Sequence, residues 1–260
     1  MRYRNQLRDV LAAGSVAFGA RASTLSPAMV EVYGGLDLDF VWLDFEHTGA
    51  SPLDSIPFEH LARAAEAAGV SLLVRLPSGD PAAVRKVLDT GVRSIVVPRV
   101  ETAADVRRAV RAARFDHAGE PGDRGVAHGR STGWGTDIDL DREDDTVLVG
   151  AMIETAAAVD NLEDILSVPG LGFCYLGPGD LSVSLGQPMA LDHPTVEEAV
   201  QTTLTGCSEA DVPLGRSVTT TAAAREAIEA GYGLVRLGDE VAAVEADVGS
   251  RLEAVRESAR

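Results

Sequence analysis

The sequence predicts one (β/α)8 barrel, also called a TIM barrel, that takes up residues 1–260 as a single domain. Three observations lead to this fold. Short apolar segments alternate with helical segments almost from end to end, eight such repeats occur, and 260 residues is a typical size for this barrel. A doubly wound parallel sheet is the alternative, but no G-x-G-x-x-G fingerprint follows an early strand of this sequence.

Eight segments are predicted to be the barrel strands. They are rich in β-branched residues or leucine and mostly do not alternate in polarity, which is typical of parallel strands covered on both faces. In chain order they span residues 15–20, 40–46, 71–77, 94–100, 147–154, 172–178, 213–219 and 233–239.

Capping residues mark the helices between these strands. Asp80 is expected to cap a helix whose first residue is Pro81, and Gly91 is expected to stop that helix. Thr102 and Asp105 have the spacing of a capping box at the start of the next helix.

Two segments do not fit this regular alternation of strands and helices. Residues 115–145 are rich in Gly and Asp, and a connection of this length is usually functional or disordered. Arg124, Arg130 and Trp134 within it are candidates for a lid or a subunit contact. The last helix, from about Val241 to Arg260, is longer than barrel closure needs, and we expect it to pack on a neighbouring subunit.

The bulk composition excludes several classes of protein. A formal net charge of −17 argues against nucleic-acid binding, which needs clustered Lys and Arg. No apolar stretch reaches the roughly eighteen residues of a membrane-spanning helix, and the charged N-terminus lacks the apolar core of a signal peptide. Cys174 and Cys207 are expected to be free thiols in a cytoplasmic protein. We interpret Cys174, in a predicted buried strand, as a core residue rather than a nucleophile.

The acidic excess points to a salt-rich origin. Lys86 is the only lysine among 23 basic residues, which face 40 acidic ones. A GC-rich genome would replace lysine by arginine without a physical cause, but codon bias alone does not explain so many carboxylates. We therefore favour a halophilic source.

Thermal stability and assembly are consequently expected to rise when KCl is raised from about 0.1 M to above about 1 M. Over this range the Debye length falls from about 10 Å to 3 Å or less, so repulsion among surface carboxylates is screened. Melting temperatures measured across a KCl series test this expectation. A melting temperature that stays flat or falls with salt would support codon bias instead.

Two carboxylates stand at the ends of consecutive predicted strands. Glu154 ends the segment VGAMIE, and Asp180 follows the segment YLGPG. Strand ends of a (β/α)8 barrel meet at one mouth, where active sites lie. Two converging carboxylates without a Cys or His partner suit a hard divalent cation such as Mg, Mn or Co.

Each carboxylate alone has a simpler interpretation. Glu154 would be a first-turn acid favoured by the helix dipole, and Asp180 would be the N-cap of a short helix. The glycines that flank Pro178 favour a ligand site, because Gly177 and Gly179 let the backbone amides approach a ligand closely.

Two further strands end in groups suited to catalysis. His47 follows one strand, and a nearby carboxylate would fix its tautomer and tune its pKa, as a general base requires. Its simpler interpretation is a surface loop residue. Arg75 ends the next strand, an unusual place for a charge unless it is paired or meets an anion.

The single lysine excludes one chemistry. A Schiff-base aldolase needs a lysine at a strand end inside the barrel, whereas Lys86 lies in the middle of a predicted helix and is expected to face outward. Carbanion chemistry in this barrel would therefore use a metal as its electron sink.

Four motifs occur in a fixed order. They are D-x-E-H at residues 44–47, V-R-x-P at 74–77, I-E-T at 153–155 and G-P-x-D-L-S at 177–182. Together they resemble the HpcH/HpaI aldolase/citrate lyase family, and the resemblance extends over residues 10–255.

The resemblance implies class II, metal-dependent cleavage of 4-hydroxy-2-oxo acids to pyruvate and an aldehyde, and the reverse condensation. Glu154 and Asp180 would hold the metal. His47 would be the acid/base, acting through a metal-bound or nearby water, and Arg75 would stabilise the enolate oxygen. Backbone amides around Gly177–Asp180 would hold the pyruvate carboxylate.

The resemblance also implies a homo-oligomer, commonly a hexamer with an exchanged C-terminal helix. Either Asp44, or Asp89 of a neighbouring subunit, would orient His47, and the sequence does not decide between them. Two positions depart from the family pattern. Phe45 replaces a typical Gly and is expected to narrow the mouth, and Gly179 replaces a more usual Ala without consequence if only its backbone contacts substrate.

Three other functions compete with this one. A CoA-ester lyase of the citrate or malyl type shares the barrel and the acidic pair, but it usually lacks the D-x-E-H histidine. A sugar-phosphate enzyme would have a Gly-rich phosphate loop after strand seven or eight. A non-catalytic barrel binding protein would not require a carboxylate pair, a His and an Arg at strand ends.

Overall fold

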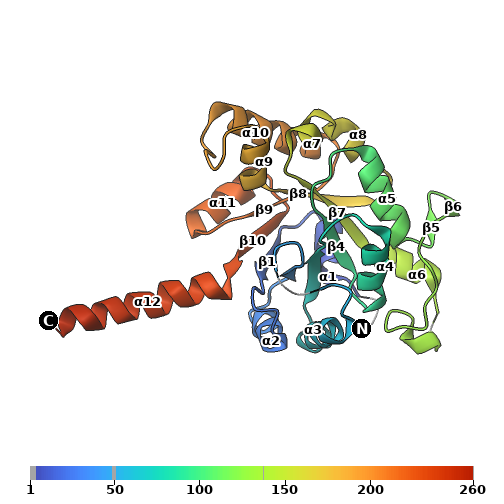
Figure 1. Cartoon of the computed structure of the whole chain (residues 1–260), viewed down its shortest axis with the longest axis horizontal. Helices are drawn as coiled ribbons and strands as arrows, with labels where there is room; N and C mark the ends of the chain where they lie inside the picture. Colours follow the sequence, from blue (N-terminus) through green and yellow to red (C-terminus); the bar gives the residue numbers. More distant parts are fainter. Residues whose placement is uncertain (1–3, 49–50, 137, 260) are drawn as a thin grey trace.

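The structure is a computed structural model and describes residues 4–48, 51–136 and 138–259. Its centre is a closed barrel of parallel strands in the order β1-β10-β9-β8-β7-β4-β3-β2 (Figure 1). These strands are β1 (Ala17–Arg21), β2 (Phe40–Asp44), β3 (Ser71–Arg75), β4 (Ser94–Val97), β7 (Leu148–Ile153), β8 (Leu171–Leu176), β9 (Leu214–Ser217) and β10 (Leu234–Asp239). The predicted fold and each predicted strand are confirmed.

Strands from the two ends of the chain close the ring. β1 pairs in parallel with β10, so that Ala17 lies beside Leu234 and Gly19 beside Arg236. On its other edge β1 pairs with β2. Because the ring is closed, the barrel leaves no unpaired strand edge.

The helices begin where the capping residues predict. The Asp80 carboxylate accepts hydrogen bonds from the first turn of α4, and Thr102 and Asp105 form the capping box of α5. The helices are α1 (Gln6–Ala12), α2 (Pro27–Gly35), α3 (Ser55–Ala68), α4 (Pro81–Asp89), α5 (Ala103–Ala113), α6 (Leu140–Thr146), α7 (Ala156–Asp160), α8 (Leu162–Leu166), α9 (Pro178–Ser184), α10 (Pro194–Glu209), α11 (Thr221–Glu229) and α12 (Glu240–Ser258).

A hydrophobic cluster fills the inside of the barrel. Helix α1 closes the bottom, where Leu7 and Leu11 join this cluster and Asn5 donates hydrogen bonds to the Ser94 hydroxyl and the Thr146 carbonyl, both at 2.9 Å. A second, larger cluster lies between the strands and the surrounding helices. With the lower interior filled, the strand ends at the opposite mouth are the place for a ligand.

The segment of residues 115–145 lies at the bottom of the barrel. It contains the short strands β5 (Asp116–His117) and β6 (Glu120–Pro121), the 3-10 turn η1 (Gly133–Gly135) and α6. Its buried Arg124 forms an ion pair with Glu143 at 3.0 Å, and Arg93, which precedes β4, pairs with the same carboxylate at 2.6 Å.

The lid interpretation of this segment is therefore wrong for the chain's own mouth. Arg124 is used in the buried ion pair, and Arg130 pairs with Glu66 near the end of α3, at 2.5 Å. A connection that leads from the end of a helix to the start of a strand must lie at the bottom of such a barrel. Trp134 is 61% exposed, and its use in a subunit contact stays a prediction.

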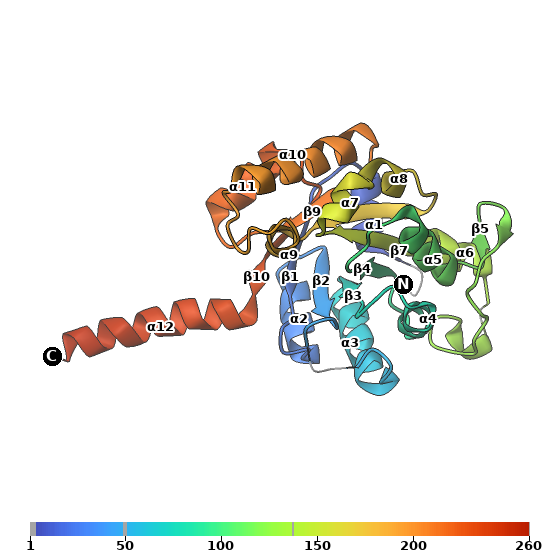
Figure 2. The same cartoon turned by 45° about the horizontal axis from the view of Figure 1, so that its top comes forward.

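The last helix, α12, leads away from the barrel in both views (Figures 1 and 2). Its first residue, Glu240, anchors it, because the Glu240 carboxylate accepts hydrogen bonds from the backbone amides of Ser23 and Thr24 at 3.0 and 2.7 Å. Beyond that point the helix is exposed, including Val248 and Leu252. The long final helix is confirmed, and its contact with a neighbouring subunit stays a prediction.

The two cysteines lie side by side in the outer core. Cys174 of β8 and Cys207 of α10 are both buried and free. The neighbouring Cys207 thiol and complete burial raise the pKa of Cys174, so Cys174 is a core residue and no thiolate nucleophile. In the part of the chain that the structure describes, no helix is long and apolar enough to cross a membrane.

Candidate active site

Glu154 follows β7 at the barrel mouth and is only 1% exposed. Its Oε1 accepts a hydrogen bond from the backbone amide of Arg99 at 2.6 Å, whereas its buried Oε2 has no partner among the described residues. Arg99 adopts a positive φ of 51°, which few non-glycine residues do and which is frequent at functional sites. Gly177 is required beside it, because a Cβ there would lie 2.7 Å from Glu154 Oε2.

The electrostatics of Glu154 favour a bound cation. Burial raises the pKa of Glu154 to about 7, and the negative charges of Glu46 and Asp180 add to the shift. The positive charge of Arg75 does not outweigh these effects, so this buried carboxylate with an orphaned oxygen would gain from the charge of a divalent cation. Among the described residues no group of three acidic, His or Cys side chains could hold a metal, so a cation here would have two protein ligands. This suits Mg²⁺, which usually keeps several waters.

Asp180 lies in the first turn of α9 and is exposed at the mouth. Gly177 is the N-cap of this helix, so the interpretation of Asp180 as the N-cap itself is wrong. Pro178 takes the first helical position and has no N–H, which leaves the amides of Gly179 and Asp180 in the first turn without an intrahelical acceptor. Space permits the family's usual Ala at position 179, since a Cβ there would meet only the Met189 sulfur at 3.7 Å.

Arg75 ends β3 and is held by two carboxylates. Its Nε donates to Asp44 Oδ1 at 3.0 Å, its Nη2 to Asp44 Oδ2 at 2.5 Å, and its Nη1 lies 2.9 Å from Glu46 Oε2. Burial alone would lower the pKa of Arg75, but the hydrogen bonds and charge of Asp44 outweigh burial and raise it. The same pairing holds the pKa of Asp44 below its usual range, although burial alone would raise that pKa. Both groups are therefore charged at neutral pH.

His47 reaches the mouth from the loop after β2, with 60% of its side chain exposed. Its Nε2 lies 3.5 Å from Glu46 Oε2. The contact between His47 and Asp44 is a hydrogen bond from the His47 backbone amide to the Asp44 carboxylate, at 3.3 Å, so among the described residues neither expected aspartate contacts the imidazole. Asp89 ends α4 at the bottom of the barrel, where its carbonyl accepts from Ser131, and its action on a neighbouring subunit stays a prediction.

Phe45 does not narrow the mouth, contrary to expectation. It is buried in the outer hydrophobic cluster and stacks on Phe58 of α3, with ring centroids 4.7 Å apart. Side chains alternate along a strand, so Asp44 points into the barrel and Phe45 toward the helices. Substitution of the usual Gly at this position therefore fills the outer layer and leaves the mouth open.

Two groups of this site were missed by the sequence analysis. Glu46 contacts both Arg75 and His47, and only its place in the D-x-E-H motif marked it. The backbone amide of Arg99 holds Glu154, and a backbone contact of this kind has no sequence signal of its own. Burial raises the pKa of Glu46 even though the charge of Arg75 opposes the shift.

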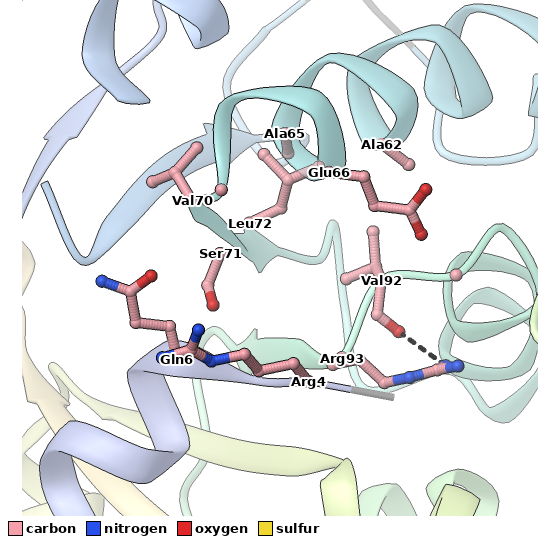
Figure 3. Close-up of a pocket in the computed structure, with 12 residues that line it drawn as sticks. Arg4, Gln6, Ala62, Ala65, Glu66, Val70, Ser71, Leu72, Val92 and Arg93 are labelled. Atoms are coloured by element: carbon pink, nitrogen blue, oxygen red, sulfur yellow. Dashed lines mark hydrogen bonds between the residues drawn. The ribbon is translucent and has the colours of Figure 1, made fainter. Parts of the chain in front are cut away.

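A cavity at the other end of the barrel is shown in Figure 3. Its lining includes Gln6 of α1, Ser71 at the start of β3, and Arg93 just before β4. Since the starts of the strands form the bottom of a (β/α)8 barrel, this cavity is remote from Glu154 and Arg75. We assign it to the packing of α1 against the barrel.

Replacing Glu154 by Gln is expected to stabilise the metal-free protein at pH 8. The pKa of Glu154 is about 7 in the folded state against an ordinary 4.5, so the folded state keeps a proton that the unfolded chain loses as the pH rises. This stabilising contribution is fully present below pH 4.5 and is lost as the pH rises through about 7, by about 3 kcal/mol in all. Urea unfolding of both proteins with chelator at pH 5 to 8 measures it. If the two stability curves run parallel, the raised pKa is wrong.

The sequence also matches a known protein family. Residues 21–245 match the sequence profile of the HpcH/HpaI aldolase/citrate lyase family. The chain belongs to this family. The resemblance inferred from the four motifs is thereby confirmed.

Individual HpcH/HpaI relatives cover nearly the whole chain. A hydroxypyruvate/pyruvate aldolase of Cupriavidus necator is 32% identical over 91% of this chain and 87% of its own. A 2-dehydro-3,6-dideoxy-6-sulfogluconate aldolase of Pseudomonas putida is 29% identical over 88% of each chain. The crystal structure of an HpcH/HpaI aldolase/citrate lyase family protein from Burkholderia cenocepacia J2315 superposes with a TM-score of 0.90, at 33% identity, over 97% of this chain and 100% of the other.

Proposed function

We propose that this protein is a metal-dependent class II aldolase that cleaves 4-hydroxy-2-oxo acids to pyruvate and an aldehyde, and catalyses the reverse condensation. Its family relatives are named aldolases, which confirms that it is a carbon–carbon lyase. The observation that carries the finer proposal is the buried Oε2 of Glu154 near Asp180 and Arg75, which has no hydrogen-bond partner among residues 4–48, 51–136 and 138–259.

Glu154 and Asp180 would hold the divalent cation. When bound, Mg, Mn or Co supplies positive charge that stabilises the negative charge developing on the 2-oxo oxygen. The amides of Gly179 and Asp180 in the first turn of α9 are free to hold the substrate carboxylate, and Gly177 keeps that turn close to Glu154.

Arg75 adds a fixed positive charge at the same place. A guanidinium has five N–H groups, and the contacts with Asp44, Glu46 and the Met152 sulfur use four of them. The remaining N–H group can donate to the enolate oxygen as charge develops there. Asp44 positions Arg75 and does not itself meet the substrate in this scheme.

His47 acts as the acid/base. It takes the proton of the 4-hydroxyl while the C3–C4 bond breaks, and the bond electrons pass to the enolate of pyruvate. A proton returned to C3 then completes pyruvate. Glu46 supports the charged imidazole, because its carboxylate lies 3.5 Å from Nε2. The 60% exposure of the His47 side chain leaves it open to substrate.

Assembly and location complete the proposal. The exposed apolar residues of α12, among them Val244, Val248 and Leu252, support a homo-oligomer, a hexamer by resemblance, in which this helix packs on a neighbouring subunit. The free thiols of Cys174 and Cys207 support a cytoplasmic protein that acts on small molecules rather than on nucleic acid or membranes.

Pyruvate release from a panel of 4-hydroxy-2-oxo acids, each assayed with Mg, Mn or Co, tests this function. Release from at least one acid is expected, and the rates rank the aldehydes and metals. A CoA-ester lyase of the citrate or malyl type is the second candidate, so a CoA ester belongs in the panel. If the CoA ester is cleaved and none of the free acids is, the proposal is overturned.

Replacing Arg75 by Lys is expected to lower kcat/KM for cleavage by about ten- to a hundredfold. Lysine keeps the charge but lacks the planar guanidinium that donates hydrogen bonds to both Asp44 oxygens. Steady-state kinetics measures the loss. Arg63→Lys on the surface of α3, where Arg63 pairs with Glu59, is the matched control and is expected to change nothing. Wild-type kinetics in the Arg75 variant would remove its assigned role.

A further inference from the structure

The two cysteines of the chain contact each other away from the catalytic mouth. Cys174 lies within β8 and Cys207 near the end of α10, and their buried thiols form a hydrogen bond with each other. Two consecutive residues hold both backbones in place. The Val212 amide donates to the Cys207 carbonyl at 2.9 Å, and the Cys174 amide donates to the Pro213 carbonyl at 2.8 Å. A covalent bond between the two sulfur atoms therefore needs little movement of the chain.

A cavity reaches one of these thiols from the bottom of the barrel. It has a volume of about 780 Å³ and lies among the starts of β7, β8, β9 and β10. Cys207 is part of its lining and Cys174 is not. One water needs only roughly 15 Å³ of such space, so a molecule as small as hydrogen peroxide fits easily. An oxidant that enters from solvent therefore meets Cys207 first.

Positive charge lies close to Cys207. The guanidinium carbon of Arg216 in β9 lies 5.1 Å from the centroid of the Tyr232 ring, and Arg216 forms no ion pair with the residues that the structure describes. Burial raises the pKa of Tyr232, the charge of Arg216 opposes this rise and the charge of Cys207 adds to it, so Tyr232 is near both groups. A nearby arginine favours the thiolate, which is the form that reacts with peroxide. The contact with Cys207 and complete burial instead raise the pKa of Cys174.

We propose that Cys174 and Cys207 form a redox site, which hydrogen peroxide converts to a reversible disulfide between β8 and α10. In the first step the Cys207 thiolate attacks one peroxide oxygen. The S–O bond forms, the O–O bond breaks, and the released hydroxide takes up the proton that Cys207 lost, which gives water. Cys207 is then a sulfenic acid, oxidised by two electrons.

The second step joins the two sulfur atoms. The Cys174 sulfur attacks the Cys207 sulfur, the S–S bond forms and the S–O bond breaks. The leaving hydroxide takes the Cys174 proton and becomes a second water, so two thiols and one peroxide give one disulfide and two waters. A dithiol reverses the reaction by thiol–disulfide exchange.

The cross-link would enclose residues 174–207, which contain α9 and Asp180. Closing a loop restricts the unfolded chain, so the disulfide stabilises the fold around this segment. It also keeps Cys207 from the irreversible oxidation that would follow without a second thiol. The site therefore protects the segment that carries Asp180 when the protein meets an oxidant.

Treatment of the intact protein with excess hydrogen peroxide tests this site. Thiols are counted in denaturant, peptides are mapped by mass spectrometry without reduction, and melting temperatures are measured before and after dithiothreitol is added. The wild-type protein is expected to lose both thiols, to give a peptide pair joined through Cys174 and Cys207, and to melt roughly 5–10 °C higher until it is reduced. Met189→Leu removes an exposed methionine and is the matched control for methionine oxidation, so it is expected to show the same rise.

Single variants test the order of the two steps. Cys174→Ala leaves Cys207 without a partner, so Cys207 is expected to proceed to sulfinic acid, which dithiothreitol does not reverse. Cys207→Ala leaves only Cys174, which is expected to react at least about tenfold more slowly than Cys207 does in the other variant. Faster oxidation of Cys174 would overturn the proposed order.

The wild-type protein decides the proposal even if a variant fails to fold. Retention of both thiols under excess peroxide, or a disulfide that joins two subunits, overturns the redox site. An internal disulfide that leaves the melting temperature unchanged or lowers it overturns the protective role. None of these measurements uses the aldolase reaction, so a failure here leaves the proposed function standing.

Discussion

Removing divalent cations is expected to reduce pyruvate release at least about 10³-fold, and adding Mg, Mn or Co to restore it. The reason is the arrangement around Glu154, whose buried Oε2 has no hydrogen-bond partner in the part of the chain that the structure describes and whose acidic neighbours disfavour its charged form. Without a cation, only the Arg75 guanidinium, which already faces Asp44 and Glu46, would offset the charge that cleavage places on the 2-oxo oxygen. Activity after dialysis against a chelator, and again after metal addition, measures both halves of the expectation.

Glu154→Gln is the matched variant for this experiment. It keeps the shape of the side chain but loses the charge, so metal addition is expected to raise neither its activity nor its melting temperature. Treatment with pyruvate and borohydride is expected to leave the wild-type protein active, because Lys86 is exposed on α4 and cannot form an imine in the barrel. Full turnover by the metal-free protein would exclude the metal-dependent mechanism.

The second large effect concerns His47. Replacing it by Ala is expected to slow cleavage by about 10²- to 10⁴-fold, the usual contribution of a positioned acid/base. Metal affinity is expected to stay nearly unchanged, because the imidazole contacts Glu46 rather than Glu154. Single-turnover cleavage and calorimetric metal titration measure the two properties separately.

His60→Ala provides the control for this variant. His60 is an exposed histidine of α3, and its loss is expected to leave cleavage intact. Wild-type cleavage by the His47 variant would show that the acid/base is another group. A large loss of metal affinity would instead identify His47 as a metal ligand.

The fold could be predicted almost completely from the sequence because its signals are local. Strands covered on both faces are continuous apolar segments, and Asp80 and Thr102 mark helix starts by residue type alone. Lys86, the only lysine, could be placed outside the barrel from helical position alone. One error concerned the direction of a side chain. Phe45 directly follows the inward-pointing Asp44 at the end of β2, so the alternation of side chains already directs Phe45 to the helix layer.

The candidate site could be predicted only in part. Glu154, Asp180 and Arg75 could be found because they stand at strand ends, and strand ends converge in this fold. The contacts that hold these side chains and shift their pKa values could not be predicted. The Arg99 amide that holds Glu154 depends on a backbone conformation, and the pairing of Arg75 with Glu46 as well as Asp44 depends on three-dimensional distances. The type of residue at a position determines neither the backbone conformation of Arg99 nor the distances around Arg75.

The ring closure has a consequence for how the protein loses activity. The pairing of β1 with β10 closes the ring and joins Ala17 to Leu234 across most of the chain. Contacts of such long sequence separation form late in folding, so the β1–β10 pairing is completed after the strand pairs on either side of it. Glu154, by contrast, follows β7 and Arg75 ends β3, and neither of these strands takes part in the pairing that closes the ring. Mild denaturation is therefore expected to open the β1–β10 pairing before it displaces the residues that carry cleavage, so hydrogen exchange at this pairing would rise before activity falls.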